Sequence, residues 1–80
     1  MSDPTLIAMA NKLADDCIKV QLEIGNDRLF MELGEAIGAS SQTLEEAFLT
    51  AVRTRMAEEK ARNFLAQKLK AHRAAQANSE

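Results

Sequence analysis

The sequence has neither tryptophan nor tyrosine, and its 80 residues include one cysteine, one histidine, one proline and three glycines. A disulfide within the chain needs two thiols, so none can form, and so few cysteine and histidine ligands argue against a metal site. Scarce glycine and proline beside abundant alanine, leucine, glutamate, lysine and arginine are typical of helices rather than sheets. The sequence therefore predicts an all-α protein that has no cofactor and no bound metal.

Long uncharged segments are also missing. Every uncharged run is far shorter than the ~20 apolar residues that a membrane-spanning helix requires, and the N-terminal residues do not show the basic-then-apolar pattern of a secretion signal. A lone thiol among apolar neighbours suits a reducing compartment. We expect a cytoplasmic protein that does not contact a membrane.

The residues needed for catalysis are scarce as well. The single histidine, His72, lies between Lys70 and Arg73 near the C-terminus, and the single cysteine, Cys17, lies in an apolar seam. Acidic residues occur as adjacent pairs whose side chains diverge on a helix. The glycines are isolated and do not form a phosphate-binding loop. These observations predict that the protein is not an enzyme and binds no small-molecule substrate.

The small size of the chain points to association. A domain of this length buries only about 60% of the surface that its unfolded chain exposes, and small domains usually add disulfides, metals or oligomerisation. With the first two excluded, we expect a single helical domain over residues 1–80 that forms a homo-oligomer, or a complex with another protein.

The first predicted helix covers residues 4–24. Asp3 and Pro4 are favourable start residues, Gly25 is a favourable end, and apolar residues recur at steps of four and three on one face. Those residues are Leu6, Ala10, Leu13, Cys17, Val20 and Ile24. The alternation of apolar and polar residues from Ile18 to Ile24 leaves a second interpretation open, a β-hairpin over residues 18–33.

Two further helices are predicted, over residues 27–37 and 41–77. Asn26 or Asp27 is a candidate cap for the former, and Ser41 or Thr43 for the latter, with Thr43 and Glu46 spaced as a capping box. No proline or glycine follows Gly38, so the last helix is long. The predicted core of the three-helix domain comprises Leu6, Leu13, Val20, Ile24, Leu29, Phe30, Leu33, Ile37, Leu44, Phe48 and Val52.

The long helix does not keep one apolar face. Leu44, Phe48, Val52 and Met56 form one stripe, but the apolar residues beyond position 57 lie around the cylinder from it. Either the helix kinks near residues 57–59, or residues 57–77 project as an arm that packs against a partner. We favour the arm, since the kink region holds no helix breaker. Its predicted interface is Ala61, Phe64, Leu65, Leu69 and His72.

Charge is distributed unevenly along the chain. Residues 1–50 hold three basic and nine acidic residues, whereas residues 51–80 hold seven basic and three acidic ones. Opposite patches favour antiparallel or head-to-tail self-association. Helix macrodipoles favour the same order of charges, which gives the asymmetry a second, purely local explanation.

Residues 32–49, ELGEAIGASSQTLEEAFL, resemble the helix-turn-helix of bacterial DNA-binding proteins, with a turn at Gly38. The resemblance implies that the second helix of the motif enters the major groove. The residues that would then contact DNA are Ser41, Gln42, Arg53, Arg55 and Arg62. Glu45 and Glu46 depart from the expected pattern because they would face phosphates. The preferred hypothesis is a non-enzymatic protein–protein interaction module with a self-associating, adaptor or chaperone-like role, and DNA binding is the alternative.

Overall fold

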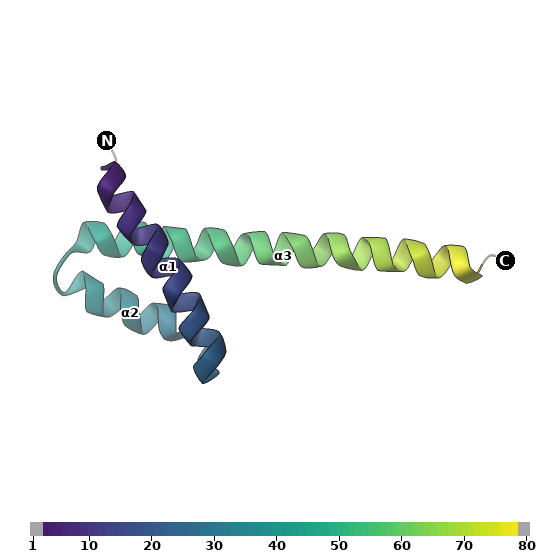
Figure 1. The fold of residues 1–80 in the computed structure, drawn as a ribbon, viewed down its shortest axis with the longest axis horizontal. Helices are drawn as coiled ribbons and strands as arrows, with labels where there is room; N and C mark the ends of the chain where they lie inside the picture. Colours follow the sequence, from purple (N-terminus) through teal and green to yellow (C-terminus); the bar gives the residue numbers. More distant parts are fainter. Residues whose placement is uncertain (1–2, 79–80) are drawn as a thin grey trace.

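The computed structural model describes residues 3–78, which form three helices: α1 (Pro4–Ile24), α2 (Leu29–Gly38) and α3 (Gln42–Asn78). α1 crosses the first part of α3, α2 lies beside the same part, and the rest of α3 extends away from both (Figure 1). Residues 3–78 contain no strand. The all-α prediction is confirmed, and the β-hairpin over residues 18–33 does not form, because α1 continues to Ile24.

α1 begins and ends as its sequence predicts. The Asp3 carboxylate accepts a hydrogen bond from the Thr5 backbone N–H at 2.9 Å, and Pro4 occupies the first turn, where no N–H is needed. At the other end Gly25 has φ 71°, a left-handed conformation that closes the helix. Both ends depend on residues adjacent to the helix in sequence.

α2 begins later than predicted, at Leu29 instead of Asp27, and its cap comes from elsewhere. The Gln21 side chain on α1 accepts a hydrogen bond from the Phe30 backbone N–H at 2.8 Å. Asn26 instead accepts from the Arg28 N–H and donates to Glu32, which shapes the turn before the helix. The prediction that Asn26 or Asp27 caps α2 is wrong because a side chain from a packed neighbouring helix takes that role.

α3 is one helix from Gln42 to Asn78, without a break near residues 57–59. Ser41 precedes it as the cap, since its hydroxyl oxygen accepts a hydrogen bond from the Leu44 N–H at 3.1 Å. The molecule is consequently elongated, with principal dimensions of 62 × 32 × 14 Å. A straight helix of this length spans about 55 Å at 1.5 Å per residue, so α3 sets the long dimension.

The core is small and made mostly of small side chains. Its buried hydrophobic residues are Ala10, Ala14, Cys17, Phe48, Ala51 and Val52. Around them pack the half-buried residues Leu13, Leu29, Phe30, Leu33, Ile37, Leu44, Ala47, Leu49 and Met56. Phe48 and Val52 were predicted correctly, whereas the buried alanines Ala14 and Ala51 were not predicted.

Two residues near the end of α1 were predicted to belong to the core, and this prediction is wrong for both. Val20 is 44% exposed and Ile24 is 59% exposed. The buried residues of α1 are the small residues Ala10, Ala14 and Cys17 in its middle, and the last turns of α1 extend past the other helices (Figure 1). The apolar face of α1 is therefore longer than the surface of α2 and α3 that covers it.

Candidate functional site

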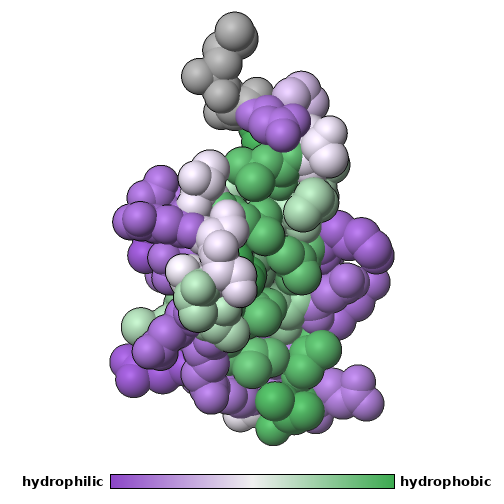
Figure 2. Space-filling view, turned by 90° about the vertical axis from the view of Figure 1, so that its left-hand side faces the viewer, coloured by the Kyte–Doolittle hydropathy of each residue, from purple (hydrophilic) through white to green (hydrophobic). Residues whose placement is uncertain are grey.

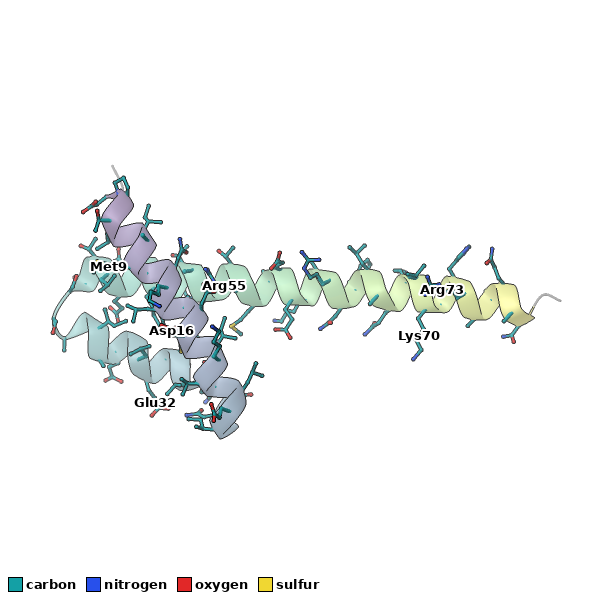
Figure 3. All side chains as sticks on the ribbon, in the orientation of Figure 1. Met9, Asp16, Glu32, Arg55, Lys70 and Arg73 are labelled. Atoms are coloured by element: carbon teal, nitrogen blue, oxygen red, sulfur yellow. The ribbon has the colours of Figure 1, made fainter. Side chains whose placement is uncertain are left out.

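The second half of α3 is the most exposed part of the molecule. Every residue from 57 to 78 is exposed, and we call this segment the arm. Side chains of the arm interact with near neighbours on the same helix: Arg62 pairs with Glu58 at 3.2 Å, and the Lys68 ammonium lies 5.5 Å from the centre of the Phe64 ring. Side chains of the arm, including Lys70 and Arg73, lie well clear of α1 and α2 (Figure 3). Its helical structure is not supported by packing within its own chain.

Large apolar side chains are exposed on one face of the arm. Phe64 is 60% exposed, Leu65 is 67% exposed and Leu69 is 48% exposed. At about 100° per residue these three share a face with the other two predicted interface residues, Ala61 and His72. Lys68 lies in the middle of this face and was not predicted as part of it. We call these six residues the arm stripe.

The arm stripe does not continue the core-facing side of α3. Phe48 and Val52 face the core and are fully buried. The residues on the same side of the helix 18 positions later are Ala66 and Lys70, which are small or charged. Since 18 residues make about five turns, the apolar face has rotated between the two halves of the helix. The predicted change of face is therefore present in a helix that stays continuous.

A groove lies between the first half of α1 and the first half of α3. It is open to solvent, has a volume of about 710 Å³ and is bounded on the α1 side by Leu6, Ile7 and Ala10. Threonines and alanines of α3 form its other side, and Asp3 and Glu46 add carboxylates to its lining. We call it the α1/α3 groove. Sequence reasoning did not find it, because it exists only where two helices distant in sequence cross.

Arg55 also lines the α1/α3 groove. Its guanidinium pairs with Asp15 at 2.7 Å and also contacts the Asn11 side chain and the Ala51 carbonyl oxygen. The hydrogen bond from Arg55 holds the pKa of Asp15 below its ordinary value. This pair ties α1 to α3 across 40 positions of sequence.

A second apolar surface lies between α1 and α2. A shallow depression of about 190 Å³ is lined by Leu13, Cys17, Val20, Leu29 and Leu33, with Asp16 beside them. Seen from the end of the molecule opposite the arm, hydrophobic residues form a band between hydrophilic flanks (Figure 2). We call the surface formed by the residues that line this depression the α1/α2 strip.

The predicted DNA-contacting residues do not gather on one surface. Arg53 and Arg55 project from opposite sides of α3, because two helical positions differ by about 200°. Arg55 is engaged by Asp15, and Arg62 is paired with Glu58. Ser41 is half-buried in its capping role, and Gln42 is exposed at the first position of the helix. Two of the three arginines thus already have carboxylate partners.

Within residues 3–78 no group of three or more histidine, cysteine or acidic side chains is arranged to hold a metal ion. His72 is exposed on the arm, and Cys17 is buried, which raises the pKa of its thiol. None of the helices in this part of the chain combines the length and apolarity needed to cross a membrane.

Comparisons with known proteins do not assign the chain to a family. Searches against protein-family models, curated proteins and solved structures give no significant match. A functional interpretation therefore depends on the arm, the α1/α3 groove and the α1/α2 strip.

Proposed function

We propose that the protein is a non-enzymatic helical module for self-association, and that the arm is the element with which it binds a second copy of itself. The exposed arm stripe is the observation that carries this proposal. An isolated helix is marginally stable in water unless packing supports it. An arm that presents two leucines and a phenylalanine on one face gains that packing by binding a protein surface.

Charge favours a second copy as the partner. The arm, residues 57–78, carries five basic and two acidic residues. The first 50 residues carry a net charge of −6, from three basic and nine acidic residues. Two arms packed on each other would bring like charges together, whereas an arm packed on the helical domain of another copy brings opposite charges together. Each chain thus carries both a basic arm and an acidic helical domain, which attract each other when two copies meet.

The DNA-binding alternative has weaker support. Affinity for DNA comes largely from lysine and arginine side chains that neutralise phosphates. Around the turn between α2 and α3 the nearest charged residues are Glu35, Glu45 and Glu46, and the Arg55 guanidinium is held by Asp15. The motif therefore presents carboxylates where a DNA-binding surface needs cations.

The experiment is sedimentation equilibrium of the full chain and two double variants. We expect wild type to have a mass above the 8.8 kDa of one chain, and Leu65→Asp with Leu69→Asp to reduce it to one chain. Asn63→Asp with Ala66→Asp is the matched control, since it adds the same charge to exposed positions outside the arm stripe. The control should keep the wild-type mass. A monomeric wild type, or an oligomer that tolerates the leucine substitutions, contradicts the proposal.

A further inference from the structure

The α1/α3 groove and the arm stripe are related by a constant spacing along α3. Apart from Arg55, the residues of α3 that line the groove are Thr43, Glu46, Ala47, Thr50, Ala51 and Thr54. Eighteen positions after each of them stand, in order, Ala61, Phe64, Leu65, Lys68, Leu69 and His72, which are the arm stripe. Each residue of the stripe therefore has one counterpart in the groove.

This spacing places both surfaces on the same side of one helix. Eighteen residues make about five complete turns of 3.6 residues, so each pair points in the same direction from the helix axis. α3 runs without a visible bend from the groove into the arm (Figure 1). The floor of the groove and the arm stripe form one continuous face, half of it flanked by α1 and half of it uncovered.

From this continuity we infer that the arm of each chain lies in the α1/α3 groove of a second copy, in an antiparallel dimer with a two-fold axis. The inference rests on the proposed function and adds the site to which the arm binds. If residues 43–54 of one copy face residues 72–61 of the other, the axis passes near Ala57 and Glu58. Both arms are then covered at once, which is the closed arrangement that two-fold symmetry requires.

The side chains on the two surfaces are complementary in size. In the antiparallel arrangement Phe64 lies opposite Ala51, and Leu65 lies opposite Thr50. Small residues in the groove thus face large residues on the arm, while Leu6 and Ile7 of α1 form the apolar wall beside them. Near the axis Thr54 faces Ala61, and small residues there permit two helices to approach closely.

Charge is complementary in the same arrangement. Lys68 lies opposite Ala47, next to Glu46, so the one cation of the arm stripe meets a carboxylate of the groove. A parallel arrangement brings arm against arm and leaves both grooves empty. The α1/α2 strip is also apolar, but its residues lie on α1 and α2 and do not continue the face of α3 that bears the arm stripe.

The first test uses two substitutions on α1 that differ in their relation to the groove. Ile7 is 41% exposed and lines the groove, whereas Met9 is 48% exposed and does not. Ile7→Lys places a cation against the basic arm, and we expect it to raise the dimer dissociation constant at least about tenfold, as loss of a central interface side chain does. Met9→Lys is the matched control and should leave the constant unchanged. Thr50→Lys, on the α3 side of the groove, should repeat the effect of Ile7→Lys.

The second test traps the arrangement with cysteines. In a Cys17→Ala background, chains carrying Thr43→Cys are mixed with chains carrying His72→Cys and oxidised mildly. We expect a disulfide between the two different chains, because the antiparallel dimer places these positions opposite each other and a disulfide needs Cα atoms within about 7 Å. Lys70→Cys, on the far side of the arm, is the control partner and should not link to Thr43→Cys.

The outcomes separate this inference from the proposed function. The leucine variants could dissociate the oligomer while Ile7→Lys and Thr50→Lys do not. In that case the arm binds another surface, such as the α1/α2 strip. The inference that the arm binds in the groove is then wrong, whereas the proposal of self-association stands. A disulfide formed by Thr43→Cys chains alone indicates a parallel dimer and also overturns the inference. A monomeric wild type overturns both.

Discussion

Phe48 and Phe64 lie on the same helix in opposite environments, and replacing each with alanine tests the division of α3 into a packed half and an arm. Phe48 is 0% exposed, and with Val52 it is the largest side chain to be fully buried. Three of the six buried hydrophobic residues are alanines, so few large side chains are fully buried in the core. Phe64 is 60% exposed and lies on the arm, which extends away from α1 and α2 (Figure 1).

The two substitutions are expected to lower the free energy of unfolding by amounts that differ several-fold. Removal of a buried phenylalanine costs about 3–5 kcal/mol, including the cavity that it leaves. A chain of 80 residues has a free energy of unfolding of roughly 4–12 kcal/mol. Phe48→Ala is expected to remove about half of it or more, since the exposed arm adds little. Phe64→Ala in the monomer should change it by less than about 0.5 kcal/mol.

The assay is urea unfolding followed by far-ultraviolet circular dichroism, first at a protein concentration low enough to keep the chain monomeric. Repeating it at high concentration adds a second comparison. There Phe64→Ala should become destabilising relative to wild type, because association stabilises the folded state only when the interface is intact. Two results would refute the division of α3 into a packed half and an arm. One is a loss of unfolding free energy below about 1 kcal/mol for Phe48→Ala, and the other is an equal loss for both variants at low concentration.

Three further predictions concern single residues of the helical domain. Gly25→Ala should lower the free energy of unfolding by about 1 kcal/mol, because φ 71° disfavours a Cβ atom, and Gly25→Asn should lower it less in the same urea assay. The pKa of Asp15 is lowered by Arg55, so this pair stabilises the fold above the ordinary carboxyl value of 3.8, and the stabilisation is lost as pH falls through the lowered pKa. Acid titration of unfolding should therefore show a smaller loss in Asp15→Asn than in wild type, and equal curves would contradict the assignment. Burial raises the pKa of the Cys17 thiol, so its reaction with an aromatic disulfide reagent should be slow in the folded chain and rapid in denaturant, and a fast folded-state reaction would argue against its burial.

The helix ends show how far local sequence information extends. Asp3, Pro4 and Gly25 act on residues beside them, and the bounds of α1 follow from them. The start of α2 does not follow from neighbouring residues, since its cap is the Gln21 side chain on α1. A hydrogen bond between two helices depends on their relative position, which no short stretch of sequence specifies.

Burial on α1 shows a similar division. The apolar periodicity predicted a buried face, and Ala10 and Cys17 on that face are buried. Val20 and Ile24 are exposed because α1 crosses α3 and extends past it. Periodicity determines which side of a helix is apolar, whereas the crossing point determines how much of that side is covered.

The sequence alone determined the all-α class, the long third helix and the rotation of its apolar face, because helix formation and helical periodicity are local properties. Five of the six residues of the arm stripe, all except Lys68, were also identifiable from this pattern. Only the tertiary structure revealed the groove to which we propose that the arm binds. The α1/α3 groove and the Arg55–Asp15 pair exist because α1 crosses α3, bringing together side chains 40 positions apart. That crossing places an apolar wall beside the first half of α3 and leaves the second half uncovered.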